Sequence, residues 1–116
     1  MANTFKVITR DVAPASAGSP ETLYTVQTGS TIIVLGLTLA NVHTAQVTGT
    51  VQLVSTTTQT SQTQNTTAHI VKDIPVPVGS SVEIMAGNKV VLEATDSISV
   101  SATGATDVAL SYMEIT

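Results

Sequence analysis

The chain has 116 residues, which is enough for one domain with a real hydrophobic core but not for two. Its formal net charge is −4, with only four basic residues, and this argues against partners such as nucleic acid or anionic membranes, which require clustered Lys and Arg. The absence of cysteine removes a disulfide framework and a thiolate metal site from consideration.

Nine segments are predicted to be β-strands, because β-branched residues dominate them and no apolar period of 3.6 residues is present. In chain order they are 4–11, 22–28, 31–41, 46–55, 67–74, 80–86, 89–94, 97–103 and 107–115. Gly87-Asn88, between the sixth and seventh, predicts a two-residue hairpin. Eight or nine short strands without a helix predict an all-β fold, an antiparallel sandwich or barrel. Of these, we expect a jelly-roll-like β-sandwich formed by residues 1–116 as a single domain.

Alternation of side chains predicts which faces of the strands are buried. Val47, Val51 and Leu53 share one face of 46–55, and Ile98 and Val100 share one face of 97–103. We expect these apolar faces to line the core.

Two of the predicted strands, 31–41 and 107–115, are apolar on both faces. In 31–41, alternation places Ile33, Leu35, Leu37 and Leu39 on one face and Ile32 and Val34 on the other. Such strands lie either at the centre of a thick structure or under a second subunit. A chain with 42% hydrophobic and only 10% charged residues favours oligomerisation. The residues predicted for a subunit interface are Ile32, Val34, Met113 and Ile115.

The stretch 55–67, STTTQTSQTQNTT, has no apolar or charged residue and no Gly or Pro. It could be a linker, a disordered segment or a loop. A linker would leave about fifty residues on each side, too few for two β-domains. The composition also lacks the Pro, Glu, Lys and Gly of typical disorder. We therefore predict an uncharged loop or ribbon that extends a hairpin of 46–55 and 67–74 and acts as a contact arm. Its candidate residues are Thr57, Thr58, Gln59, Thr60, Gln62, Thr63, Gln64 and Asn65.

No group of residues predicts catalysis, a metal or a cofactor. His43 and His69 lie 26 positions apart without carboxylates at ligand spacing, and no serine lies in a G-x-S-x-G elbow. A glycosidase would need two carboxylates in a cleft that is usually lined by aromatic residues, which make up only 3% of this chain. Asp96 is expected to cap a turn rather than to bind calcium. The protein is therefore predicted not to be an enzyme.

The second half, VKDIPVPVGSSVEIMAGNKVVLEATDSISVSATGATDVALSYMEI, and the earlier segment ETLYTVQTGSTIIVLGLTLAN resemble small all-β structural proteins of tailed bacteriophages. The resemblance covers roughly residues 20–116 and is a pattern of strands and turns. It implies a capsid decoration (cement) protein, or a related neck, tail or fibre module, commonly a trimer. It implies no active site.

These observations together predict a virion structural protein that binds and stabilises the phage head as a small oligomer. Its expected partners are further copies of itself, as a homotrimer, and the major capsid protein or another virion protein. The N-terminal MANTFKVITRDV has no signal-peptide pattern, and the longest apolar run, IIVLGL at 32–37, is too short to span a bilayer. Assembly in a host cytoplasm is therefore expected. A receptor- or carbohydrate-binding module is the alternative, although only Tyr24 and Tyr112 could act as stacking platforms.

Overall fold

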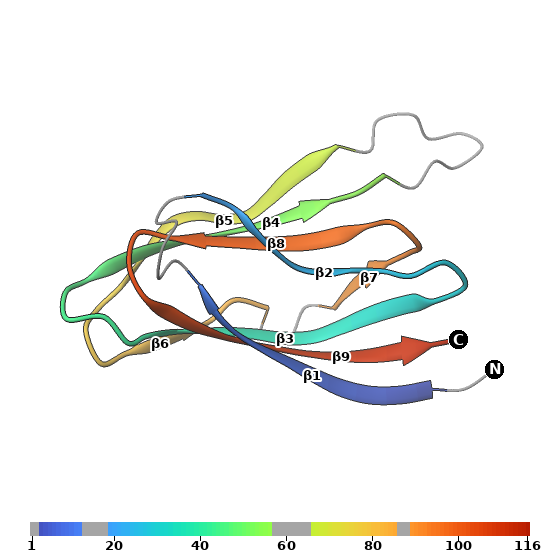
Figure 1. Ribbon diagram of the computed structural model, residues 1–116, viewed down its shortest axis with the longest axis horizontal. Helices are drawn as coiled ribbons and strands as arrows, with labels where there is room; N and C mark the ends of the chain where they lie inside the picture. The colour runs from blue at the N-terminus through green and yellow to red at the C-terminus, as the bar shows by residue number, and fades with distance from the viewer. Residues whose placement is uncertain (1–2, 13–18, 57–65, 86–88) are drawn as a thin grey trace.

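A computed structural model describes residues 3–12, 19–56, 66–85 and 89–116. In this part of the chain, two antiparallel sheets lie face to face and no helix is present (Figure 1). The strands are β1 (Asn3–Val12), β2 (Glu21–Thr25), β3 (Thr31–Asn41), β4 (Val47–Val54), β5 (Thr67–Val76), β6 (Ser81–Glu83), β7 (Val90–Leu92), β8 (Ser97–Ala102) and β9 (Thr106–Ile115). Each overlaps its predicted strand, and the observed and predicted ends differ by at most three residues, so the predicted all-β sandwich is confirmed.

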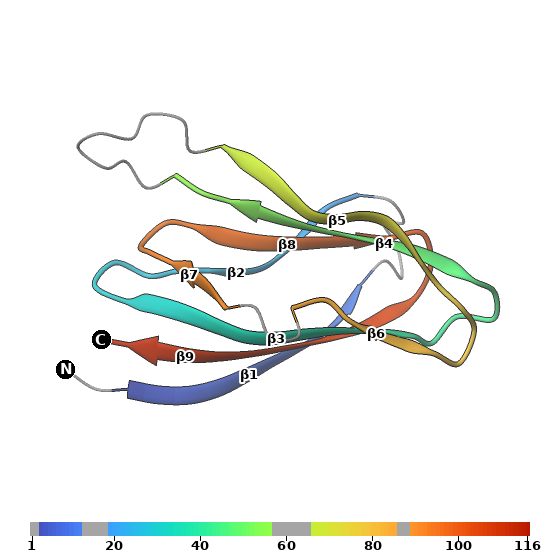
Figure 2. The same ribbon diagram turned by 180° about the vertical axis from the view of Figure 1, so that it is seen from behind.

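The strand order interleaves the two halves of the chain. The five-stranded sheet has the order β1-β9-β3-β6, with β7 also paired to β3, and the four-stranded sheet has the order β2-β8-β4-β5. Figure 2 shows the same two layers from behind, with both chain ends at one end of the sandwich. If β6 and β7 are counted as one interrupted strand, each sheet has four strands. This order is compatible with a jelly roll, and that finer description stays a prediction.

The hairpin predicted at Gly87-Asn88 is wrong for the two strands that flank it. β6 pairs with β3 at Thr38–Ala40, and β7 pairs with β3 at Ile32–Val34, both antiparallel. The physical reason is that β3, with eleven residues, offers a long edge on the side away from β9. Two short strands that pair along this edge satisfy backbone groups that a hairpin between them would leave open. Gly87-Asn88 itself lies outside the described residues.

The predicted hairpin of 46–55 and 67–74 is confirmed. β4 and β5 pair from Val47 opposite Val76 to Val54 opposite Thr67. The Thr/Gln-rich stretch 55–67 therefore joins two neighbouring strands of one sheet.

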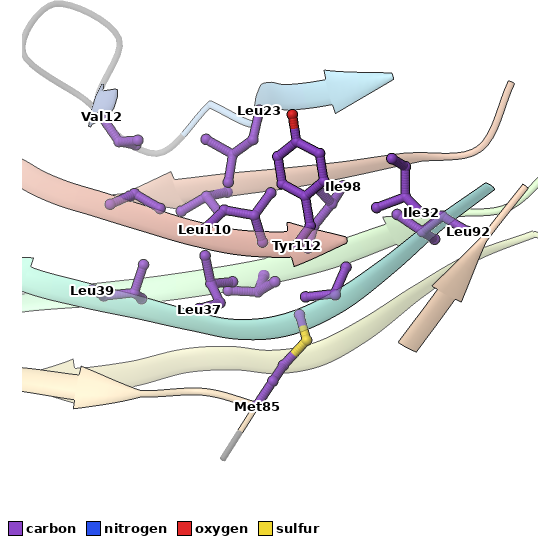
Figure 3. Packing of buried hydrophobic residues seen from close by; sticks show 14 of the residues in the cluster. Val12, Leu23, Ile32, Leu37, Leu39, Met85, Leu92, Ile98, Leu110 and Tyr112 are labelled. Carbon is purple, nitrogen blue, oxygen red and sulfur yellow. The ribbon is translucent and has the colours of Figure 1, made fainter. Parts of the chain in front are cut away.

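The core lies between the two sheets (Figure 3). Val47, Val51, Ile98 and Val100 are buried as predicted, and Leu53 packs against this cluster. On the opposite sheet the buried side chains come mainly from β3 and β9. They include Ile32, Val34, Leu37, Leu39, Val108, Leu110 and Tyr112.

A β-bulge in β3 changes which residues face the core. The pairing of β3 with β9 shifts between Val34 and Gly36. Before the bulge, Ile32 and Val34 point inward and are 1% and 0% exposed, and after it Leu37 and Leu39 point inward. An extra residue in one strand reverses the alternation from that point on. The assignment of Ile32 and Val34 to a subunit interface is therefore wrong, because both are buried within the subunit.

Candidate assembly surface

The outer face of the five-stranded sheet carries a row of large apolar side chains. Phe5 of β1 pairs with Met113 of β9, Met113 pairs with Ile33 of β3, and Ile33 pairs with Val91 of β7. Directly paired residues point to the same side of an antiparallel sheet. Phe5 is 72% exposed and Val91 58%, so this row faces away from the core.

The next row on the same face adds Val7, which is 61% exposed, opposite Ser111. Leu35, at the bulge of β3, is also exposed. We call this set the outer apolar patch: Phe5, Val7, Ile33, Leu35, Val91 and Met113. Contiguous apolar surface of this kind marks a contact surface more often than isolated exposed residues do.

Beyond the outer apolar patch, the same face becomes a shallow hollow with a volume of about 510 Å³. Its outward-facing lining comes from β1, β3 and β9 and consists of small or short side chains. We call it the small-residue hollow: Thr9, Asp11, Thr38, Ala40, Asp107 and Ala109. One face of one sheet thus has large side chains at one end and small ones at the other.

Two aspartates lie opposite one another at the far end of this hollow. Asp11 of β1 and Asp107 of β9 are direct cross-strand partners. A side-chain hydrogen bond with Asp11 raises the pKa of Asp107 above its ordinary value, and desolvation and the like charge of Asp11 act in the same direction. A proton shared between the two carboxyl groups reduces their repulsion.

Of the remaining residues predicted for function, two lie on the outer face of β9 and the others lie outside the described residues. Met113 and Ile115 lie on the outer face of β9 and are partly buried there, so their role in an interface stays a prediction. The predicted contact-arm residues 57–65 lie outside the described residues. Phe5, Val7 and Val91 were missed, although the alternation in 4–11 does group Phe5 with Val7. The side of that strand that faces the core depends on how the strand pairs with β9. The sequence pattern does not predict this pairing.

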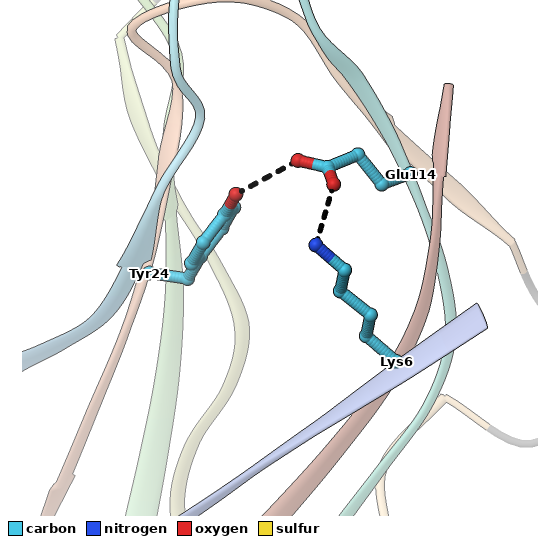
Figure 4. A network of polar contacts seen from close by, with 3 residues as sticks. All are labelled: Lys6, Tyr24 and Glu114. Atoms are coloured by element: carbon cyan, nitrogen blue, oxygen red, sulfur yellow. Dashed lines mark hydrogen bonds and ion pairs between the residues drawn. The ribbon is translucent and has the colours of Figure 1, made fainter. Parts of the chain in front are cut away.

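A polar cluster bridges the two sheets along one side of the sandwich (Figure 4). Lys6 Nζ donates to Glu114 Oε1 at 2.8 Å, and the Tyr24 hydroxyl donates to Glu114 Oε2 at 3.4 Å. The Tyr24 ring stacks on that of Tyr112, with 5.3 Å between ring centroids. The hydrogen bond and the charge of Glu114 raise the pKa of Lys6, while desolvation, followed by the charge of Glu114, raises the pKa of Tyr24. Both tyrosines are therefore engaged in packing within the subunit.

The outer face of the four-stranded sheet is polar. Gln52 and His69 are joined by a 3.0 Å side-chain hydrogen bond, and the Asp73 N–H donates to Thr50 Oγ1 at 3.0 Å. Thr48, Ser101 and Thr103 lie beside them around a hollow of about 210 Å³. The two outer faces of the sandwich therefore differ sharply in chemistry.

Asp96 caps the turn between β7 and β8, as predicted, and it also holds the start of the Thr/Gln-rich stretch. Its carboxylate accepts hydrogen bonds from the Glu93 N–H at 3.1 Å and from the Thr56 N–H at 2.8 Å, and Asp96 is only 4% exposed. Thr95 has a φ of 74°, which is rare for a β-branched residue, and its hydroxyl is hydrogen-bonded to that of Thr56. The entry to 57–65 is thus attached to the turn between the two sheets.

Among the described residues, no cluster of three or more His, Cys, Asp or Glu side chains is placed to bind a metal. No helix within these residues has the length and apolarity to cross a membrane. Comparison of the chain with protein-family models, curated proteins and solved structures finds no match. Any functional assignment therefore rests on the residues and their arrangement.

Proposed function

We propose that this protein is a non-enzymatic structural subunit that works by assembling with other protein surfaces. The observation that carries this proposal is the outer apolar patch on the five-stranded sheet. Phe5, Val7 and Val91 are each more than half exposed and neighbour one another or Met113 and Ile33 on one face. Burial of this face against another protein would remove about 25 cal/mol of unfavourable free energy per Å² of apolar surface.

The low charge of the chain supports the same proposal. A chain with only 10% charged residues has few groups to keep a bare β-surface in solution. A low content of charged residues favours assembly, because the core of a protein–protein interface is depleted of charged residues. It also stabilises the fold by mass action.

Within this role, we propose a bacteriophage virion component, and specifically a capsid decoration (cement) protein that binds and stabilises the head as a small oligomer. The support is the sequence resemblance over residues 20–116, which also suggests a trimer and the major capsid protein as partner. Mass spectrometry of purified virions of the phage that encodes this protein tests whether the protein is part of the virion. Absence of the protein from virions contradicts the virion role.

The stretch 57–65 is proposed as a contact arm, because its first described neighbour, Thr56, is held by Asp96 and Thr95 at the end of the sandwich. Deletion of 57–65, closed by a short Gly-Ser turn, is expected to leave the melting temperature close to that of the wild type and to weaken binding to phage heads. If the deletion unfolds the protein, the stretch belongs to the sheet and is no arm.

A receptor- or carbohydrate-binding module at the neck, tail or fibre is the second candidate. The polar hollow around Gln52, His69 and Thr50 favours it, because amide, imidazole and hydroxyl groups hydrogen-bond sugars. Against it, the described lining contains no Phe, Tyr or Trp on which a sugar could stack. A glycan array distinguishes the carbohydrate-binding candidate from the assembly role. Hits that disappear in Gln52→Ala, and persist in Val7→Asp, support this candidate over the assembly role.

A further inference from the structure

We infer that the outer face of the five-stranded sheet packs against the same face of a second copy of this chain, about a two-fold axis that lies between the two faces and runs across the strands. In this arrangement the row of Phe5, Met113 and Ile33 in each copy lies opposite the small-residue hollow of the other, and Val7 faces its own mate. The inference deepens the proposed assembly role and rests on it. It replaces the three-fold arrangement suggested by the resemblance.

The first support is shape. On β9, Met113 and Ala109 lie two residues on either side of Ser111. A two-fold axis that runs across the strands through Ser111 brings the row of Met113 opposite the partner's row of Ala109. On β1 the same operation brings Phe5 opposite the partner's Thr9, because Phe5 pairs with Met113 and Thr9 with Ala109. On β9 and β1, large side chains therefore meet small ones, and the two-fold axis repeats each contact.

The second support is charge. The described outward-facing residues of this face include three carboxylates, Asp11, Asp107 and Glu83, all at the hollow end. Arg10 also lines the hollow, and Lys89 directly precedes β7. An axis parallel to the strands would place the acidic ends of two copies against one another, which is costly. The axis across the strands instead places Asp11 and Asp107 opposite the uncharged pair Asn3 and Ile115 of the second copy.

The third support is area. Four strand positions about 4.8 Å apart and about 3.4 Å per residue along the ten residues of β9 give a footprint of about 650 Å². The accessible area of a surface roughened by side chains exceeds its footprint. It therefore approaches the roughly 800 Å² per partner of a standard interface. Two-fold pairing through one self-complementary face is also the commonest symmetry of homo-oligomers.

Sedimentation equilibrium at micromolar concentration tests the pairing. The wild type is expected to be a dimer. Val7→Asp is expected to raise the dimer dissociation constant at least tenfold, because the axis brings Val7 close to its own mate and the variant places two aspartates together. Val78→Asp is the matched control, since Val78 is 55% exposed and lies in the turn before β6, and it should dimerise as the wild type does. Circular-dichroism melts establish that both variants fold.

Cross-linking tests the position of the axis. The chain has no cysteine, so Ser111→Cys and Ser81→Cys each carry a single thiol. Ser111 lies at the axis, and a short bis-maleimide is expected to link two Ser111→Cys chains within the dimer. Ser81 pairs with Ala40 at the hollow end and lies about 27 Å from its mate in this packing, so Ser81→Cys should remain unlinked.

The outcomes separate the inference from the proposed function. A wild-type trimer or monomer overturns the two-fold pairing, as does cross-linking of Ser81→Cys but not Ser111→Cys. A monomer that still binds phage heads, and loses this binding in Val7→Asp, overturns the pairing, leaves the proposed function intact and shows that the capsid covers this face. A dimer that is absent from virions supports the pairing and removes the virion role.

Discussion

Replacement of Asp96 by Asn tests whether one buried carboxylate holds the end of the sandwich together. The Asp96 carboxylate uses its two oxygens to accept backbone N–H groups of Thr56 and Glu93, and the residue is 4% exposed. Asparagine keeps one acceptor and turns the other into a donor that faces an N–H group. One charge-assisted hydrogen bond is then lost, and one part-buried N–H is left without this acceptor.

The expected cost follows from these contacts. A hydrogen bond to a charged group contributes about 1.5–3 kcal/mol, so we expect Asp96→Asn to lower the free energy of unfolding by about 2 kcal/mol. With an unfolding entropy of about 2.1 cal/mol/K per residue, a chain of 116 residues then melts about 8 °C lower. Urea denaturation at pH 7, followed by circular dichroism at one fixed protein concentration, measures this change.

A matched control separates burial from charge. Asp73 is exposed and has a φ of 53°, a conformation that Asn also tolerates, so Asp73→Asn makes the same charge change without a buried partner. We expect Asp73→Asn to change stability by less than about 0.5 kcal/mol. Hydrogen exchange should accelerate at the Thr56 amide only in Asp96→Asn. Equal stability of the two variants, or an unchanged Thr56 amide, would show that the carboxylate bonds contribute nothing.

Three further changes test the sheet pair and the core. The raised pKa of Asp107 means that the folded chain keeps this proton up to a higher pH than the unfolded chain does, so stability falls as pH rises through that window. Asp107→Asn should therefore raise the free energy of unfolding by about 0.2–1 kcal/mol at pH 7 and leave it unchanged at pH 3, where Asp107 carries its proton; thermal melts at both pH values measure this difference. Gly49→Val should lower the free energy of unfolding by about 1–3 kcal/mol, because a Cβ at this position comes within 2.8 Å of Leu39 Cδ1. Urea denaturation should show a smaller decrease when the same change is made in a Leu39→Val background. Leu110→Ala should lower the free energy of unfolding by about 2–5 kcal/mol, since Leu110 is 1% exposed. A urea midpoint within error of the wild-type value would contradict the position of Leu110 in the core.

Local chemistry was sufficient to predict the strands. Runs rich in Val, Ile and Thr, separated by turn residues, located all nine strands that the structure describes, and proximity along the chain predicted the pairing of β4 with β5. The turn role of Asp96 was equally local, since the carboxylate reaches Glu93 only three residues away. Its second partner, Thr56, is forty residues away, and no sequence pattern indicated it.

The candidate surface was only partly accessible from the sequence. Met113 and Ile115 could be assigned to the outer side of a doubly apolar strand. Phe5 and Val7 could not, because alternation in β1 is symmetric until its pairing with β9 determines which side faces the core.

The amino-acid sequence by itself determined that this chain forms β-strands, approximately where each one lies, and that it has too little charge for the apolar surface it carries. These properties depend on each residue and its near neighbours. The tertiary structure decided that a bulge in β3 turns Ile32 and Val34 into the core, that β6 and β7 share one edge of β3, and that Phe5, Met113, Ile33 and Val91 form one exposed row. These depend on which distant strands meet, and in what register, which is a property of the whole sandwich.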